Sequence, residues 1–224
     1  MNKQKKTLRI AMSVLLTIAA IISLILIFNK PIGEKIISDN QQQALSHLNR
    51  KQIQQNQKKK GQFDFSKVKS INGVTAMGSK LQNPSVIGAI AIPAVGLKLP
   101  ICKGLSNVNM STGASTMRED QQMGKGNYPL AGHYMTNYGA LFSPIERTKQ
   151  GERIYLTDLK NVYEYEIYSK EIVSPKSVNL VDDTQKTQCT LITCANGGAM
   201  RWAVRGIYLG KAPANKQNLQ LFNL

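Results

Sequence analysis

At 224 residues the chain has room for one sizeable domain with accessory segments, and its formal net charge of +16 is the outlying feature of its composition. Residues 1–70 hold 13 of the 29 basic residues but only 3 of the 13 acidic ones. A nucleic-acid-binding protein more often concentrates its charge on the folded domain, with aromatic or Gly-Arg signals that are missing here, so the composition argues against a nucleic-acid partner. A basic segment beside a membrane instead fits attraction to anionic lipid or wall polymer.

The first element in chain order is an apolar run, Ile10–Phe28, preceded by four basic residues. As a helix these 19 residues would extend about 28 Å, close to a hydrocarbon core of about 30 Å. A cleaved signal peptide has a shorter apolar region and a small-x-small site, whereas Ile21, Ile22 and Leu24 crowd that place here. We therefore expect an uncleaved single-pass anchor in the cell membrane, with residues 1–9 in the cytoplasm and the remainder of the chain outside the cell.

Glutamine and lysine dominate the next segment, residues 29–70. Its sparse apolar residues have spacings that allow a marginal helix with a thin apolar stripe: Ala44, Leu45, Leu48 and Ile53. Such a stripe would not bury enough surface to fold alone. We expect a partly helical stalk that holds the following domain off the membrane.

Residues 71–224 are predicted to form a strand-rich domain. Short β-type runs, separated by turn residues, occur at 85–93, 95–104, 126–134, 152–158, 161–175, 189–194 and 201–211. Seven or eight short strands with one or two short helices are typical of an all-β barrel or sandwich.

The three cysteines cannot all pair with one another, so at least one should be free unless it bonds another chain. Cys189 and Cys194 lie five apart on one predicted strand, and an odd spacing points them to opposite faces. Cys102 and Cys189 are interpreted as small buried hydrophobic residues. Cys194 differs because it ends its strand before the turn sequence ANGG, where its thiol can meet solvent.

A nucleophilic cysteine needs thiolate character, which a nearby cation or imidazolium supplies. The histidine of the domain, His133, follows the small residues Ala131 and Gly132 at a strand end, where another group can approach the backbone closely. Arg201 begins the strand after Cys194, so a hairpin would bring its guanidinium beside the thiol as a donor to a developing oxyanion. Spacing alone leaves open that the three side chains never meet.

These residues resemble the sortase family. TLITC is similar to the motif that ends the seventh strand of sortases, LAGHY…GALFSPI to their histidine segment, MRWAVRG to the start of their eighth strand, and AIPAVGLKLPICKG to their early strands. The resemblance runs from about Ile87 to Leu209 and implies a closed seven- to eight-stranded sortase-type β-barrel. The N-terminal anchor and the lack of a C-terminal one resemble class A, the housekeeping sortases of Gram-positive bacteria.

The resemblance implies a cysteine transpeptidase that cuts LPXTG-type sorting signals of surface proteins between Thr and Gly. Cys194 would form a thioacyl enzyme, and the acyl group would pass to an amine of a lipid-linked peptidoglycan precursor. His133 would transfer protons, and Arg201 would bind the carbonyl oxygen or the substrate backbone. Three further positions are implied to contact substrate: Thr193, Ala131 and Pro93.

No cofactor or metal is expected. Some sortases bind calcium through acidic residues in the loop before the third strand and in a later loop. Residues 102–117 contain no Asp or Glu, although Asp182 and Asp183 could have supplied the far side, and calcium needs several oxygen ligands. Lys103 is a candidate to occupy part of that space.

Other readings of the sequence remain open at this point. One is a cysteine peptidase or an L,D-transpeptidase-like enzyme, although the latter more often has its histidine close to the cysteine. Another is a tethered basic module that binds the cell wall without catalysis, in which Cys194 is incidental.

Overall fold

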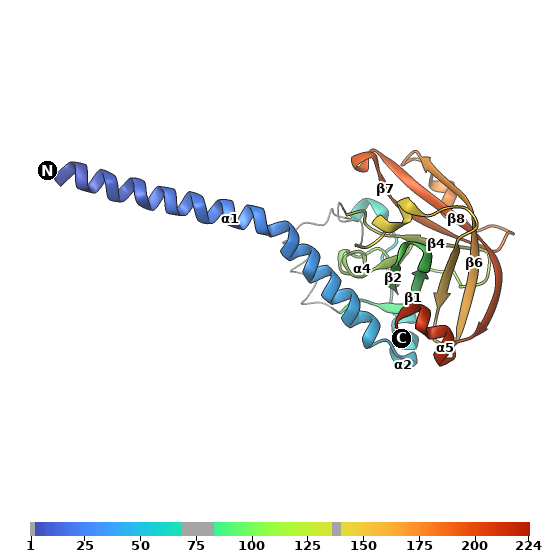
Figure 1. Ribbon diagram of the computed structural model, residues 1–224. Helices are drawn as coiled ribbons and strands as arrows, with labels where there is room; N and C mark the ends of the chain where they lie inside the picture. Colours follow the sequence, from blue (N-terminus) through green and yellow to red (C-terminus); the bar gives the residue numbers. More distant parts are fainter. Residues whose placement is uncertain (1–2, 69–82, 136–139) are drawn as a thin grey trace.

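The computed structural model describes residues 3–68, 83–135 and 140–224, without the side chains of residues 3–5, 7 and 25–34. Eight strands close a barrel in the order β1-β2-β3-β4-β7-β8-β6-β5, which confirms the expected all-β barrel (Figure 1). The β2–β3 and β4–β7 pairs are parallel, and the other pairs are antiparallel. The strands are β1 (Val86–Ile92), β2 (Leu97–Cys102), β3 (Ala114–Thr116), β4 (Asn127–Ala131), β5 (Arg153–Thr157), β6 (Asn161–Val173), β7 (Gln188–Ala195) and β8 (Met200–Pro213). The expected domain start at residue 71 lies outside the described residues.

The barrel is filled by alternate residues of its strands, as a period of two requires. In β7, Cys189 and Leu191 belong to the main core and are fully buried. Tyr165 of β6 is the largest of the fully buried side chains, and its hydroxyl accepts a hydrogen bond from Gly124 N at 2.9 Å. Cys102 is also fully buried, and all three cysteines are free. The expectation that Cys102 and Cys189 are core residues is therefore confirmed.

Short helices occupy the connections, as expected. α4 (Asn107–Thr112) begins after Ser106, whose side chain accepts a hydrogen bond from Asn109 N. This is a standard N-cap contact. The others are η1 (Phe65–Lys67), η2 (Pro93–Val95), η3 (Ser143–Arg147), η4 (Val178–Val181), η5 (Asn196–Gly198), α5 (Lys216–Leu219) and η6 (Gln220–Phe222).

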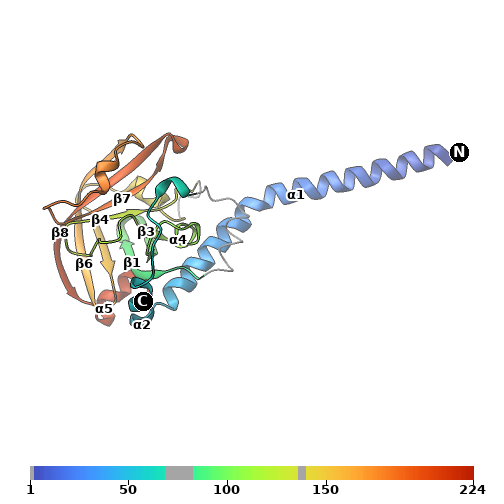
Figure 2. The ribbon, with the colours of Figure 1, turned by 180° about the vertical axis from the view of Figure 1, so that it is seen from behind.

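The segment expected to form a partly helical stalk is helical in large part and lies against the barrel. It forms the end of α1 (Lys3–Ser46) and all of α2 (Arg50–Gln57), which run beside β1, β2 and α4 (Figure 2). Leu45 joins the buried Phe222 of the C-terminal tail in an apolar cluster that includes the small residues Ala89 and Ala91 of β1. Asn56 Nδ2, also buried, donates to Val86 O at 2.8 Å. The thin apolar stripe folds because the barrel and the tail supply the surface that it lacks alone.

The N-terminal half of α1 extends away from the barrel (Figure 1). Its large apolar side chains are 49–68% exposed: Leu8, Ile10, Met12, Val14, Leu15, Leu16, Ile18, Ile21, Ile22 and Leu24. Within the described parts of the chain, no helix was found to combine the length and the apolar character that crossing a membrane requires.

Candidate functional site

Three neighbouring strands bring the candidate residues to one end of the barrel. In the antiparallel pair of β7 and β8, Cys194 lies directly opposite Arg201. In the parallel pair of β4 and β7, Ala131 lies opposite Ile192. The chain continues this pairing beyond β4, because Gly132 N–H donates to Ile192 O at 3.1 Å. His133, the next residue of the chain, therefore lies beside the C-terminal end of β7, where Cys194 is located.

Cys194 lies on the outer face of the barrel wall. Cys189 and Leu191 face the core, so strand alternation turns Cys194 outward. Its side chain is partly exposed, unlike the two other cysteines. Arg201, its partner across the hairpin, shares this outer face, since directly opposed residues of an antiparallel pair project to the same side.

The β7–β8 connection holds Arg201 in place. Asn196, Gly197 and Gly198 have φ values of 50°, 64° and 99°, a left-handed backbone that glycine adopts without steric cost. The turn presents carbonyl groups to the guanidinium, and Nη1 of Arg201 donates to Gly198 O and to Met200 O, both at 2.8 Å. The glycine loop recognised in the sequence thus both reverses the chain and positions the arginine.

The imidazole of His133 is largely buried, and one of its ring nitrogens has no hydrogen-bond partner in the part of the chain that the structure describes. Within the described residues its Nε2 is buried and has no hydrogen-bond partner. Burial lowers the pKa of His133 to about 4, from an ordinary value of 6.5, because desolvation disfavours the charged ring. The imidazole of the free protein is therefore neutral at pH 7, although the same burial makes it a weaker base than an exposed histidine.

The backbone beside His133 is packed as closely as the small residues there predicted. A Cβ on Gly132 would lie 2.4 Å from the ring of Phe142, a fully buried core residue, so a larger side chain would displace that ring. Thr193 donates from Oγ1 to Gly132 O at 2.7 Å. The residue before Cys194 is thereby tied to the residue before His133, which fixes the two strand ends to each other.

The three predicted substrate contacts have these surroundings. Thr193 is 2% exposed and its hydroxyl is engaged by Gly132, while Ala131 is 1% exposed and packs with Leu105 and Met110. Pro93 is exposed and begins η2, at the end of β1. The predicted substrate contacts of all three remain predictions.

Arg205 shares the outer face with Arg201 but has different partners. Its Nη2 donates to Glu171 and to Ser169 of β6, and its guanidinium lies 5.6 Å from the centre of the Tyr168 ring. Arg205 is thus bound to the β6 side chains, whereas Arg201 is bound to the turn beside Cys194.

A basic residue that the sequence did not single out joins the loop after β3 to the later loop that holds Asp182 and Asp183. Arg118, in the β3–β4 loop, pairs with Asp120 at 3.1 Å and with Asp183 of the β6–β7 loop at 3.6 Å. Asp183 also accepts a hydrogen bond from Asn127 N, which is the main reason that its pKa is lowered. Lys103, the other basic residue considered for this space, donates from Nζ to Gln57 O at the end of α2 and lies 3.9 Å from Glu119 of the β3–β4 loop. Within the described residues no cluster of three or more His, Cys, Asp or Glu side chains could hold a metal ion.

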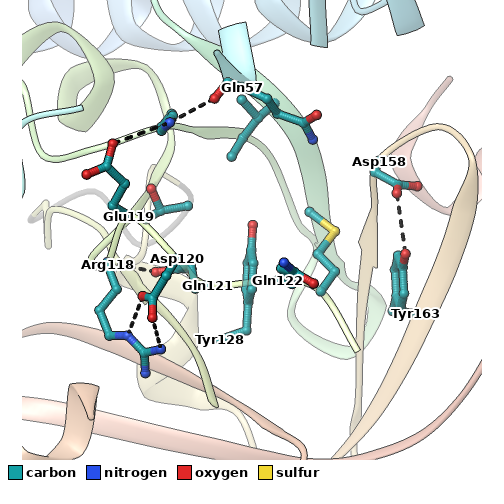
Figure 3. A pocket seen from close by; sticks show the side chains of 13 residues that line it. Gln57, Arg118, Glu119, Asp120, Gln121, Gln122, Tyr128, Asp158 and Tyr163 are labelled. Atoms are coloured by element: carbon teal, nitrogen blue, oxygen red, sulfur yellow. Dashed lines mark hydrogen bonds and ion pairs between the residues drawn. The ribbon is translucent and has the colours of Figure 1, made fainter. Parts of the chain in front are cut away.

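A separate cavity of about 450 Å³ lies between α2 and the β3–β4 loop (Figure 3). Its lining is polar and includes Gln57, Tyr128 and the Asp158–Tyr163 pair, which is joined by a hydrogen bond of 3.3 Å. Cys194, His133 and Arg201 do not line it. We therefore assign the candidate site to the ends of β4, β7 and β8 and not to this cavity.

The closed barrel, with a cysteine and an arginine paired across β7 and β8 and a histidine at the end of β4, defines a sortase-type architecture. Residues 90–208 match the family described as "Sortase domain". Sortase A of Streptococcus agalactiae is 42% identical over 191 residues, covering 81% of this chain and 77% of that protein. Sortase A of Listeria monocytogenes is 39% identical over 180 residues, covering 79% and 81%. The solved structure of the Listeria enzyme superposes with a TM-score of 0.61 over 62% of this chain and 98% of that one. The protein belongs to the sortase family, as a class A sortase.

Proposed function

We propose that this chain is a membrane-anchored cysteine transpeptidase that cuts LPXTG-type sorting signals of surface proteins between Thr and Gly. It then joins the cut surface protein to an amine of a lipid-linked peptidoglycan precursor. The observation that carries the proposal is the pairing of Cys194 with Arg201 at the strand end that His133 follows. Sortases are cysteine transpeptidases that act on surface proteins and cell-wall precursors, and the sorting signal is the one that the sequence motifs imply.

In the first half-reaction, neutral His133 takes the thiol proton as Cys194 Sγ attacks the threonine carbonyl carbon. Arg201 donates a hydrogen bond to the oxygen on which negative charge develops. The carbon–nitrogen bond to glycine then breaks, and His133 returns its proton to the departing amine. A thioester on Cys194 remains and retains the energy of the cut peptide bond.

In the second half-reaction, the amine of the precursor attacks the thioester carbonyl and gives a proton to His133. Cys194 Sγ leaves as the new amide bond forms, and the proton on His133 restores the thiol. No ATP is required, because the acyl group stays activated throughout. Water competes with the amine as acceptor, so the ratio of transfer to hydrolysis measures how well the site receives an amine.

The N-terminal half of α1 supports the anchoring part of the proposal. Ten of its large apolar side chains are about half exposed or more, and such a surface is costly in water. Lipid contact would remove that cost and would place the domain beside membrane-bound substrates. Tethering enzyme and substrate to one surface raises their effective concentration.

The proposal is tested by incubating the full chain in lipid nanodiscs with a fluorogenic LPXTG peptide and triglycine. We expect a transfer product joined at threonine, identified by mass spectrometry. Hydrolysis of unrelated peptides at comparable rates would show a peptidase instead. No turnover, with unimpaired binding to purified cell wall, would show a wall-binding module.

We further propose that this activity needs no calcium. The guanidinium of Arg118 pairs with Asp120 of its own β3–β4 loop and with Asp183 of the β6–β7 loop, so a cationic side chain already lies between the carboxylates of these two loops. We expect added calcium or a chelator to change the transfer rate less than about twofold, while Arg118→Ala lowers kcat/KM about 3- to 10-fold because the β6–β7 loop loses a charged contact. Arg153→Ala, which removes exposed ion pairs on the barrel wall, is the matched control. A severalfold rise of the parent's activity with calcium would contradict this proposal.

A further inference from the structure

Beyond β4, the backbone around His133 is hydrogen-bonded to residues that follow it by eight or nine positions in the chain. Phe142 N–H donates to His133 O at 3.0 Å, and Met135 N–H donates to Ser143 Oγ at 2.8 Å. Residues 132–135 and 140–143 are called the histidine segment below. Its position depends on these contacts and on what packs against its outer side.

Leu141 is the strained point of the histidine segment. Its φ is 48°, in the left-handed region, which costs a residue with a Cβ about 1–2 kcal/mol. Such a conformation persists only when the surrounding packing holds it. Leu141 is 1% exposed although it lies in a loop, so its side chain must be covered by another part of the chain.

That cover comes from α1, more than a hundred positions earlier in the sequence. Ile37 is 1% exposed and forms an apolar cluster with Leu141 and the partly buried Met135. Figure 2 shows this part of α1 running beside the barrel and α4. The same helix whose N-terminal half projects from the domain therefore ends in direct contact with the histidine segment.

A second buried residue of α1 provides an internal comparison. Leu45 lies eight positions after Ile37, about 12 Å further along the helix and about 80° round its axis. It is 8% exposed and packs with Phe222, Ala89 and Ala91, far along the helix from the histidine segment. Ile37 and Leu45 thus both dock α1, but only Ile37 contacts the segment that bears His133.

We propose that Ile37 is a positioning residue for His133: by covering Leu141 and Met135, the anchor helix holds the histidine segment in its active geometry. This inference rests on the proposed transpeptidase function. Removing the Ile37 side chain takes away the packing that maintains the left-handed Leu141, and the segment then relaxes at its outer side. Because Leu141 directly precedes Phe142, whose amide binds the His133 carbonyl, the relaxation reaches the imidazole.

The test compares the full chain in lipid nanodiscs with three variants: Ile37→Ala, Ile37→Leu and Leu45→Ala. We expect Ile37→Ala to lower kcat about 10-fold with KM changed less than about twofold, since small displacements of a catalytic group are costly in rate. Ile37→Leu, which restores the buried volume, should recover most of the rate. Leu45→Ala should stay within about twofold of the parent in kcat, although it should lose about as much thermal stability as Ile37→Ala does.

A spectroscopic measurement keeps this test independent of turnover. The chain has two histidines, so ring signals of histidine-labelled protein can be assigned by comparison with His47→Gln. We expect the His133 signals to shift or broaden in Ile37→Ala and to stay in place in Leu45→Ala. Equal kcat losses in the two alanine variants, or unchanged His133 signals in Ile37→Ala, would overturn the inference. If Ile37→Ala does not fold, Ile37→Val replaces it in both measurements. We then expect kcat to fall about 2- to 3-fold and the His133 signals to shift. A parent without transfer activity would instead refute the proposed function, and the histidine signals would still decide the role of Ile37.

Discussion

Replacement of Cys194 by alanine is expected to abolish transfer of an LPXTG peptide to triglycine, with a loss of at least about 10⁴-fold, because no other group on this face can form the thioester. Cys194 is the cysteine whose thiol is not enclosed in the core, and it lies opposite Arg201. Mass spectrometry adds a direct reading. With peptide and no amine, the parent should accumulate an adduct of the acyl fragment that Cys194→Ala does not form.

The two remaining cysteines are matched controls within the same chain. Cys102 and Cys189 are fully buried, and desolvation raises the pKa of each thiol, to about 12 for Cys189, which keeps both protonated and unreactive. Cys102→Ala and Cys189→Ala should each lose about 1–2 kcal/mol of stability and keep most of the activity. Loss of the acyl adduct in Cys189→Ala, with the adduct retained in Cys194→Ala, would show that the nucleophile has been assigned wrongly.

The strands were predictable wherever they are long enough to show a pattern. Seven of the eight follow from short apolar or alternating runs bounded by turn residues. The missed strand, β3 (Ala114–Thr116), has three residues, too few for a period of two to be recognised. Its existence depends on pairing with β2 and β4, which are distant in the sequence.

The packing of residues 35–57 could not be predicted for a related reason. Leu45 and Ile53 form a stripe too thin to indicate a folded helix by itself. The surface that buries Leu45 is built from β1 and from Phe222 in the C-terminal tail, so its presence appears only once the barrel has formed. The expectation of a partly helical stalk followed from local composition, which does not report contacts of this kind.

The candidate site was predictable to the extent that strand ends determine it. Cys194 and Arg201 flank a short turn, so a hairpin brings them together whatever the remaining fold. His133 needed the parallel pairing of β4 with β7, a contact between segments about sixty residues apart, and the family resemblance supplied it. Arg118 carried no signal, since an arginine in a polar loop is ordinary until Asp183 is found beside it.

Replacement of His133 by glutamine is expected to lower the transfer rate about 10³-fold, because proton transfer by a positioned side chain contributes about 10²- to 10⁴-fold. Glutamine is close to histidine in size, so Gly132 and Phe142 should keep their packing. His47→Gln changes the exposed histidine that directly follows α1 and should leave the rate unchanged. A His133→Gln variant within about tenfold of the parent would assign proton transfer to another group.

The same variant should change how stability depends on pH. The folded His133 has a pKa of about 4 and the unfolded one about 6.5, so between these values the unfolded chain binds a proton that the folded chain does not. Stability should therefore fall as the pH drops from 6.5 towards 4, with His133 contributing up to about 3 kcal/mol of the loss. The free energy of unfolding, measured by denaturation at several pH values in this range, should depend less on pH in His133→Gln than in the parent. In His47→Gln it should follow the parent. Coinciding curves for His133→Gln and the parent would show that burial does not lower the pKa of His133 in the folded protein.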